Sequence, residues 1–284
     1  MKKSTLLLVL LLFLSFVVVS LPQIGIVKAE STIYVRADGT VEGTDKIQRD
    51  GDVYTLTGDL HGLHLRIERS NIIFDGNVHT LYQNIVLRYV TNVTVKNTFI
   101  TQPEGTGIDL DHCSNSVIVN NTIWGCGLID EWMGPYAAAI SVSSGDSNII
   151  IGNNITRNEI GIIINLAPDT LIYNNNFVSN HLDVSEWGGL GWMSVPSIAI
   201  FDNDKEGNYW SKYNGIDEDG NGIGDTPFRI DSYNTDNFPL MEPVPVIPEF
   251  PSWTPLLIML VAVVAIIAVY RRGIPKNNLG REFS

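Results

Sequence analysis

An acidic, glycine-rich segment near residue 220 has the residue types and spacing of a calcium-binding loop. It reads Asp217-Glu-Asp-Gly-Asn-Gly-Ile-Gly-Asp225. Oxygen donors fall at loop positions 1, 3, 5 and 9, with glycine at 6 and a backbone carbonyl at 7, as at the start of an EF-hand loop. Position 12 is Phe228 instead of a bidentate glutamate, so further ligands would come from elsewhere. We expect calcium here; the alternative is a solvated Asp/Gly turn. The expected ligands are Asp217, Asp219, Asn221, the Ile223 carbonyl and Asp225.

A second group of charged residues could act on a sugar polymer. In Ile108-Asp-Leu-Asp111 the two-residue period of a strand turns both aspartates to the same face. Arg88 falls one repeat earlier, at the position that pairs with Asp111. Polysaccharide lyases and hydrolases whose fold is a stack of such strands use carboxylates and an arginine on this face. Asp109, Asp111 and Arg88 are therefore catalytic candidates. The alternative is surface charge pairing, which adds little stability.

Three predicted insertions interrupt the repeats, at 101–107, 124–138 and 181–196. We predict that all three extend the same corner, after the third strand of a repeat, where insertions often build a binding surface. The last two insertions combine aromatic rings with carboxylates, which favours sugar binding. Alternatively, the rings cover exposed strand edges and prevent them from pairing with another chain. The ligand-binding candidates are Trp124, Trp132, Tyr136, Trp187, Trp192, Asp130 and Glu131.

A repeated unit must position all these residues. A β-branched run, an asparagine and an apolar residue recur at Asn97, Asn121, Asn153 and Asn175, with a weaker copy at Gly76; the steps are 21, 24, 32 and 22 residues. Such a period, with short Val/Ile runs and no helical pattern, predicts a solenoid whose strands stack about 4.8 Å apart. The predicted fold is therefore all-β, a parallel β-helix. The four asparagines are predicted to stack in register at one turn as an amide ladder.

Both ends of the chain have the pattern of targeting segments. Lys2-Lys3 and the apolar run to Leu21 indicate a secretory signal peptide, or else an uncleaved N-terminal anchor. The apolar run 255–270, followed by Arg271-Arg272, predicts one spanning helix with a cytoplasmic tail. The predicted organisation is a signal peptide (1–29), an N-terminal cap (30–60), the β-helix (61–213), the acidic closing segment (214–240), a proline-rich stalk (241–254), the transmembrane helix (255–270) and the tail (271–284).

The charge and the residue types of the chain limit the classes of molecule that it could bind. The formal net charge is −13, and residues 202–242 contain ten acidic against three basic side chains, which argues against nucleic acid and favours cations. Five scattered histidines and the lack of a Cys/His or Met-rich cluster argue against copper. Cys113 and Cys126 could form a disulfide in an oxidising compartment. Glycosylation sequons begin at Asn92, Asn120 and Asn154.

The segment from Gly207-Asn-Tyr-Trp210 to Leu240 resembles the closing segment of NosD-like β-helix proteins. These proteins assist maturation of a copper enzyme and belong with β-helix domains of carbohydrate-binding proteins and sugar hydrolases. The resemblance extends over about residues 34–240 and implies a right-handed parallel β-helix. Pro248-Glu-Phe250, ahead of the apolar run, is similar to the PEF-type sorting signal of archaeal surface proteins, which implies removal of the tail by a membrane enzyme.

Together these patterns predict an archaeal surface protein on the extracellular face of the membrane, held by one C-terminal anchor. We expect it to bind carbohydrate or another cell-envelope component without catalysis, and to carry calcium in its closing segment. Two alternatives remain open. One is a polysaccharide lyase or glycoside hydrolase, and the other is a NosD-like accessory protein for a copper enzyme.

Overall fold

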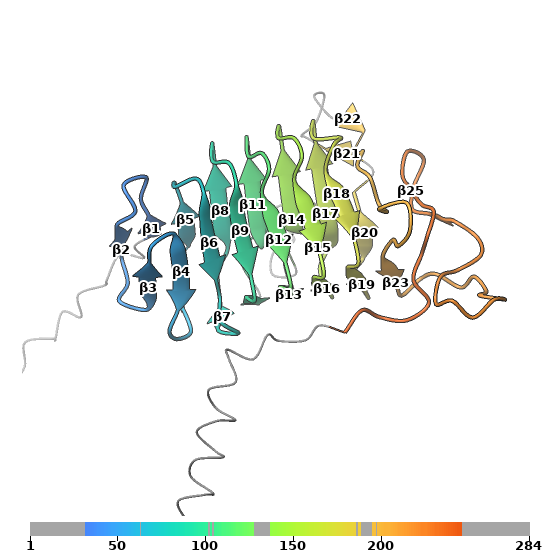
Figure 1. Cartoon of the computed structure of the whole chain (residues 1–284), viewed down its shortest axis with the longest axis horizontal. Helices are drawn as coiled ribbons and strands as arrows, with labels where there is room; N and C mark the ends of the chain where they lie inside the picture. The colour runs from blue at the N-terminus through green and yellow to red at the C-terminus, as the bar shows by residue number, and fades with distance from the viewer. Residues whose placement is uncertain are drawn as a thin grey trace, which may run out of the picture. The chain divides into compact units, whose positions relative to one another are not determined.

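Short strands recur in a fixed order along the chain and wind into a parallel β-solenoid of right-handed type, which confirms the predicted fold class (Figure 1). This computed structural model describes residues 32–62, 64–101, 103, 105–127, 137–185, 187–188, 195–196 and 198–245. The described residues contain no helix long and apolar enough to cross a membrane. The predicted signal peptide, spanning helix and tail lie outside these ranges, as does most of the stalk.

Each turn of the solenoid contributes one strand to each of three sheets. The eight-stranded sheet contains β2 (Val41–Glu42), β1 (Ile33–Val35), β5 (Leu65–Ile67), β8 (Ile85–Arg88), β11 (Ile108–Asp111), β14 (Ala138–Ser143), β17 (Ile160–Asn165) and β20 (Leu182–Val184). The seven-stranded sheet contains β3 (Ile47–Asp50), β4 (Val53–Leu56), β6 (Ile72–Asp75), β9 (Val93–Lys96), β12 (Val117–Val119), β15 (Ile149–Ile151) and β18 (Leu171–Tyr173). The six-stranded sheet contains β7 (Thr80–Leu81), β10 (Phe99–Thr101), β13 (Thr122–Trp124), β16 (Asn154–Thr156), β19 (Asn176–Val178) and β23 (Tyr209–Trp210).

The core consists of inward side chains that repeat from strand to strand. In the middle of the seven-stranded sheet, Val95, Ile118 and Ile150 occupy equivalent positions, and all three are fully buried. Ile100 and Ile123 repeat in the same way on the six-stranded sheet. No turn can bury this apolar column alone, because each strand contributes only one or two inward residues. Stacking of turns therefore supplies the hydrophobic stabilisation.

The corner after the seven-stranded sheet holds the amide ladder, with one correction to the predicted register. Asn121, Asn153 and Asn175 stack in register, each donating from Nδ2 to Oδ1 of the next asparagine at 3.0 Å; Asn208 is the fourth member. Asn97 does not belong to this column, because the backbone N–H of Thr98 donates to Asn121 Oδ1 and so Thr98 occupies the ladder position.

Asn97 instead belongs to a neighbouring column in the left-handed backbone region. Its φ is 54°, and the equivalent residues Asn120, Gly152 and Asn174 have φ of 55°, 67° and 54°. Asparagine and glycine tolerate this conformation better than other residues do. The corner thus needs two adjacent residues with separate tasks: the first turns the chain and the second forms the ladder.

The N-terminal end is closed by two antiparallel strands. β2 pairs with β1 at the edge of the eight-stranded sheet, and β3 pairs with β4 at the edge of the seven-stranded sheet. These strands cover edges that would otherwise expose unpaired backbone groups. The cap is smaller than expected from residues 30–60, because β1 and β4 already pair in parallel with β5 and β6 as strands of the solenoid.

The C-terminal end is closed by an aromatic cluster over the last turn. The Trp210 ring stacks on Phe177 with centroids 4.2 Å apart and contacts Phe228 at 5.1 Å. Phe228 begins β24 (Phe228–Arg229), which forms a hairpin with β25 (Thr235–Asp236). The buried Asp236 carboxylate accepts hydrogen bonds from the backbone N–H of Asn208 at 2.7 Å and from Trp210 Nε1 at 2.8 Å. Asp236 therefore takes the place of the next asparagine and ends the ladder.

Candidate binding face and acidic loop

The outer face of the eight-stranded sheet brings together the predicted catalytic candidates. Backbone pairing places Asp111 directly beside Arg88 on β8 and beside Ser143 on β14. Asp109 lies two residues earlier on the same face, beside Val86 and Ser141. The expected juxtaposition of two aspartates and one arginine is therefore present in the structure.

Arg88 and Asp111 form the centre of this group. The Arg88 Nε lies 3.6 Å from Asp111 Oδ2, and His112 Nδ1 lies 2.7 Å from Asp111 Oδ1. The His112 ring packs against Tyr89, with centroids 4.8 Å apart and an interplanar angle of 31°. Arg88, Asp111 and His112 are all partly open to solvent, so the ion pair alone adds little stability.

Tyr89 and His112 were not among the residues selected from sequence. Both follow directly after a strand of the eight-stranded sheet and adopt left-handed φ angles of 54° and 55°. Ser144 and Leu166, which follow the next two strands of the sheet, have φ of 52° and 54°, so this conformation belongs to the corner on four successive turns. Tyr89 is 74% exposed. The available sequence signal was an aromatic residue directly after a predicted strand on two successive turns.

Asp109 differs from Asp111 in its electrostatic environment. Burial raises the pKa of Asp109 above the ordinary aspartate value, and the nearby negative charge of Asp111 adds to this effect. Arg88 and a hydrogen bond from Ser141 act in the opposite direction but do not cancel it. A carboxyl group with a raised pKa beside a second carboxyl group is a pairing that can divide acid and base roles.

The two aromatic insertions do not share a corner, contrary to the prediction. The first connects β13 of the six-stranded sheet to β14, so it enters the eight-stranded sheet at the N-terminal ends of its strands. The second leaves after β20, at the C-terminal ends of these strands, and includes the hairpin of β21 (Trp187–Gly188) and β22 (Val195–Pro196). The insertions therefore attach at opposite ends of the strands of the eight-stranded sheet.

Most of the predicted ligand-binding residues lie outside the described part of the chain. Trp124 is described and ends β13, half-buried on the outer face of the six-stranded sheet. Trp187 is described only as part of a strand, without its side chain. The residues that fall outside the described ranges are Asp130, Glu131, Trp132, Tyr136 and Trp192.

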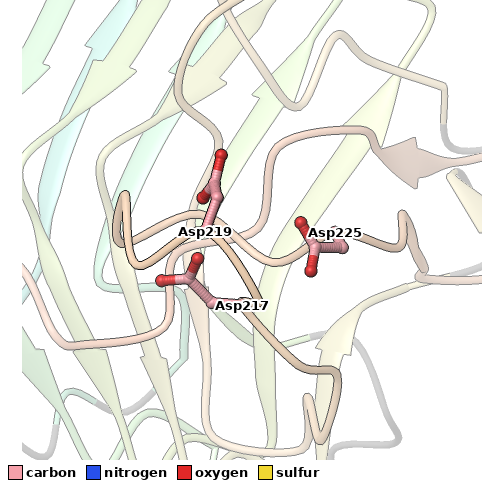
Figure 2. A group of neighbouring side chains, drawn as sticks. All are labelled: Asp217, Asp219 and Asp225. Atoms are coloured by element: carbon pink, nitrogen blue, oxygen red, sulfur yellow. The ribbon is translucent and has the colours of Figure 1, made fainter.

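The acidic loop gathers three of its predicted ligands. The carboxylates of Asp217, Asp219 and Asp225 come from one loop, and one oxygen of each lies within 4.8 Å of the others (Figure 2). Glycines at 220 and 222 adopt left-handed φ angles of 71° and 87°, which allows the chain to fold back tightly. The three carboxylates are thus close enough together to hold one metal ion.

Backbone hydrogen bonds orient the acidic side chains. Asp217 accepts from the N–H groups of Gly220 and Gly222, both at 2.8 Å, and Asp225 accepts from Glu218 at 2.7 Å. The bond from Gly222 is the largest influence that lowers the pKa of Asp217. An ionised carboxylate has about four lone-pair sites, so these bonds leave positions for a metal. Asn221 lies in the same loop, where its Nδ2 donates to Asp219 Oδ2 at 2.9 Å.

A comparison with protein-family models matches residues 18–215 to the family described as "Periplasmic copper-binding protein (NosD)". This match covers well over half of the chain. The chain belongs to the NosD family. The match includes the solenoid and ends before the acidic loop, so the family model does not extend over the calcium-loop residues. A comparison with curated proteins finds no match.

Copper, which the NosD family description names, does not fit the described residues. Copper sites use imidazole, thiolate or thioether ligands. Within the described ranges, the only group of three or more His, Cys, Asp or Glu side chains close enough to hold a metal is the all-aspartate one at 217, 219 and 225. Among the described histidines, His64 contacts Asn84, His79 contacts Asp59, and His61 stacks on Tyr82. The alternative role as a copper-enzyme accessory therefore rests on the family description alone.

The two cysteines are free thiols buried in the core of this NosD-family solenoid and do not form the disulfide that the sequence left open. They lie at different corners, because Cys113 follows the eight-stranded sheet and Cys126 follows the six-stranded sheet. Among the predicted sequons, Asn92 is exposed at a corner, whereas Asn120 and Asn154 are half-buried. Glycosylation stays a prediction.

Proposed function

We propose that this NosD-family protein binds a carbohydrate or another cell-envelope polymer on the outer face of its eight-stranded sheet, at the extracellular surface and without cleaving it. The observation that carries the proposal is the group formed by Tyr89, His112, Arg88 and Asp111. An exposed ring next to charged hydrogen-bonding groups suits a sugar, whose apolar face packs on an aromatic ring while its hydroxyls bond to polar side chains.

The position of the insertions supports the same face. Because the two aromatic insertions attach at opposite ends of the strands, a polymer lying on the sheet would pass between them. Their aromatic residues, including Trp132 and Trp187, would then extend the contact beyond the sheet. Export and a C-terminal anchor at 255–270, both read from the sequence, would hold this face outside the cell.

Alanine substitutions test the proposed face. Tyr89→Ala and Trp132→Ala should each weaken binding to an array of cell-envelope glycans by about fivefold, since losing one aromatic contact costs about 1 kcal/mol. The melting temperature should change little. Phe99→Ala is the matched control, because Phe99 is an exposed ring on the six-stranded sheet. Equal binding by wild type and the Tyr89 variant, or a loss of stability without a binding change, would contradict the proposal.

The raised pKa of Asp109 favours a second candidate function, cleavage of a glycosidic bond. Here Asp109 would be the proton donor and Asp111, paired with Arg88, would stabilise positive charge on the sugar. An assay for new reducing ends and unsaturated products on the bound polymer distinguishes the two functions. Activity that disappears in both Asp109→Asn and Asp111→Asn would establish the enzyme and replace the non-catalytic proposal.

We also propose that the acidic loop binds calcium and thereby stabilises the closing segment. Support comes from the spacing of Asp217, Asp219 and Asp225 and from the convergence of their carboxylates. At a hundredfold excess of calcium over Kd, binding to the folded state alone adds about 2.7 kcal/mol. A chelator should lower the melting temperature of the wild type and leave Asp217→Asn/Asp219→Asn unchanged. Magnesium should substitute poorly because it requires a tighter octahedral shell. If calorimetry detects no heat of calcium binding at millimolar concentration, the proposal is wrong and the loop is an acidic turn.

A further inference from the structure

The outer face of the seven-stranded sheet is apolar over three successive turns, whereas the other two sheets are largely polar outside. β12, β15 and β18 lie side by side (Figure 1). In each strand the middle residue is fully buried in the core, and its two neighbours point outward and are half-buried. By contrast, β11 and β14 of the eight-stranded sheet turn aspartate and serine outward, and β16 of the six-stranded sheet turns asparagine and threonine outward. All six outward residues of the three strands are apolar: Val117, Val119, Ile149, Ile151, Leu171 and Tyr173.

The apolar surface continues along the sheet beyond these three strands. Ile200 pairs with Leu171 and extends one outward column by a turn, and Ile73 lies in the same column two strands before Val117. Ile200, Ile198 and Ile73 are 49%, 42% and 37% exposed. Strands that are apolar on both sides are typical of sheets covered on both faces. Apolar patches of several hundred Å² mark interaction sites on soluble proteins, so this face is a candidate interface.

The area of this face matches what a protein–protein interface requires. An interface of standard size buries about 800 Å² on each partner, of which about 57% is non-polar, so each partner buries about 450 Å² of apolar surface. Ten apolar side chains supply this area if about 45 Å² of each is open to solvent. The face offers the six outward residues of β12, β15 and β18, the three exposed isoleucines and the half-buried Val53.

A second copy of the chain fits this face, because the face is complementary to itself. A two-fold axis along β15 places Ile149 and Ile151 of one copy against the same residues of the other, and β12 of each copy against β18 of its partner. Every central contact is then between apolar side chains. Two such sheets pack face to face about 10 Å apart, as in a β-sandwich, and the two solenoids run in opposite directions.

The charges at the two borders of the apolar face fit this arrangement. At the N-terminal border, Lys96 on β9 pairs with Asp75 at 3.4 Å. At the C-terminal border, exposed Asp204 and Glu206 outnumber Lys205, and Glu206 accepts a hydrogen bond from the side chain of the residue after β18 at 3.1 Å. β9 lies two strands before β15, and this acidic border follows the second strand position after it. The two-fold axis therefore brings Lys96 of each copy towards Glu206 of the other.

We propose that the protein forms a two-fold dimer through the outer faces of two seven-stranded sheets, with the solenoids antiparallel and β15 on the axis. The dimer removes the apolar face from water, which supplies the driving force for association. The eight-stranded sheet of each copy lies outside the interface, so dimerisation does not depend on what that sheet binds.

Sedimentation velocity on the full-length protein tests the dimer, in a mild detergent because the sequence predicts a spanning helix. The wild type should change from monomer to dimer as its concentration rises through the micromolar range. Ile151→Lys should raise the dissociation constant at least about a hundredfold, since the axis brings two ammonium groups together in an apolar contact. Asn165→Lys places the same charge on the eight-stranded sheet and is the matched control, which should dimerise like the wild type.

Two further variants separate loss of the interface from loss of folding. Ile151→Thr keeps a branched side chain, so it should match the melting temperature of the wild-type monomer and raise the dissociation constant about tenfold, because each copy loses apolar contact area. Lys96→Glu should weaken the dimer by placing a carboxylate against Glu206 of the other copy. Adding Glu206→Lys to Lys96→Glu should restore dimerisation, because the opposite charges then meet again across the axis.

Three results would overturn the proposal. A wild type that stays monomeric at every concentration up to the submillimolar range means that a second copy does not cover the face. A folded Ile151→Lys or Ile151→Thr variant that dimerises as tightly as the wild type places the contact elsewhere on the molecule. Failure of Glu206→Lys to restore the Lys96→Glu dimer rejects the antiparallel arrangement.

Discussion

At the scale of single residues, the solenoid depends on a few buried polar side chains that each make several bonds. Asn153 is fully buried, and its Oδ1 accepts from both the backbone and the side chain of Asn121. Its Nδ2 donates to the carbonyls of Ile118 and Ile151 as well as to Asn175. These bonds connect three successive turns through one amide. A second, shorter ladder of Asn158 and Asn180 does the same at another corner.

Asn153→Ala should therefore be strongly destabilising. The substitution leaves buried donors of Asn121 and buried carbonyl groups without partners, and each such group costs about 1–3 kcal/mol. We expect a loss of about 3 kcal/mol or more in the free energy of unfolding, measured by urea denaturation. Asn165→Ala changes an outward asparagine and should stay within about 0.5 kcal/mol of wild type. Comparable losses in both variants would disprove a special role for the ladder.

Asp236 predicts a pH dependence of stability. Burial raises its pKa to about 6 in the folded protein, while the nearby Asp202 charge acts in the same direction. The folded state thus binds a proton more tightly than the unfolded state does, so stability falls as pH rises from about 4 to about 6 and then levels off. The titration of Asp236 alone changes the free energy of unfolding by up to about 3 kcal/mol across that range.

The comparison with Asp236→Asn isolates this contribution from other carboxylates. The variant also changes the local hydrogen bonds, because an amide nitrogen, unlike a carboxylate oxygen, cannot accept from the N–H donors of Asn208, Trp210 and Phe238. Its stability should, however, lack the Asp236 share of the pH 4–6 slope. Thermal unfolding measured at half-unit pH intervals gives the difference directly. Parallel curves for the two proteins would show that Asp236 does not titrate in this range.

At the scale of elements, the strands and their stacking could be predicted because the apolar runs repeat with each turn. The predicted register was wrong by one residue at Asn97. The two sequences were aligned on a shared Asn-Thr pair, because both Asn97 and Asn121 precede threonine. The decisive signal was the pair of adjacent corner residues, Asn or Gly followed by Asn. It occurs at 120–121, 152–153, 174–175 and 207–208, whereas the earlier turn has Asn97-Thr98.

Other parts of the candidate site could not be read from the sequence. The last insertion was assigned to the wrong corner because β20 is a short strand of mixed polarity, Leu-Asp-Val, that resembles loop sequence. Tyr89 and His112 depend on a left-handed conformation and on contact between turns, neither of which a local pattern specifies. The convergence of Asp217, Asp219 and Asp225 was predictable because the three residues lie close together in sequence.

The turning position can be tested separately from the ladder. A Cβ added at Gly152 would lie 2.6 Å from Asn120 Oδ1, and the backbone there has a φ of 67°. Gly152→Ala should cost about 1–2 kcal/mol in the free energy of unfolding. The reverse type of change, Asn174→Gly at the equivalent position, should alter stability by less than about 0.5 kcal/mol. Denaturation curves of the two variants decide between this account and one in which the corner tolerates any residue.

At the scale of the whole molecule, stability should be divided among turns, as in other repeat proteins. Deleting residues 154–175 removes one complete 22-residue turn and joins Asn153 to Asn176, which is equivalent to Asn154. The shortened protein should fold with its ladder intact and a lower melting temperature. Circular dichroism and cooperative unfolding would verify this.

Deletion of residues 154–164 is the control for that experiment. It removes half a turn, so strands of one sheet would meet strands of another and apolar residues would face solvent. This variant should not fold cooperatively. If both deletions give the same behaviour, the turns are not interchangeable units and stability does not divide among them.

The reactivity of the two buried thiols can be used to measure local opening of the solenoid. Burial raises the pKa of Cys113 and raises that of Cys126 to about 12, so both side chains are neutral and shielded from reagents in the closed solenoid. A thiol becomes reactive only as an accessible thiolate. Each cysteine can be modified only when its own turn separates from its neighbours. Labelling rates at Cys113 and Cys126 therefore report how often two different corners of the solenoid open. No engineered probe is needed.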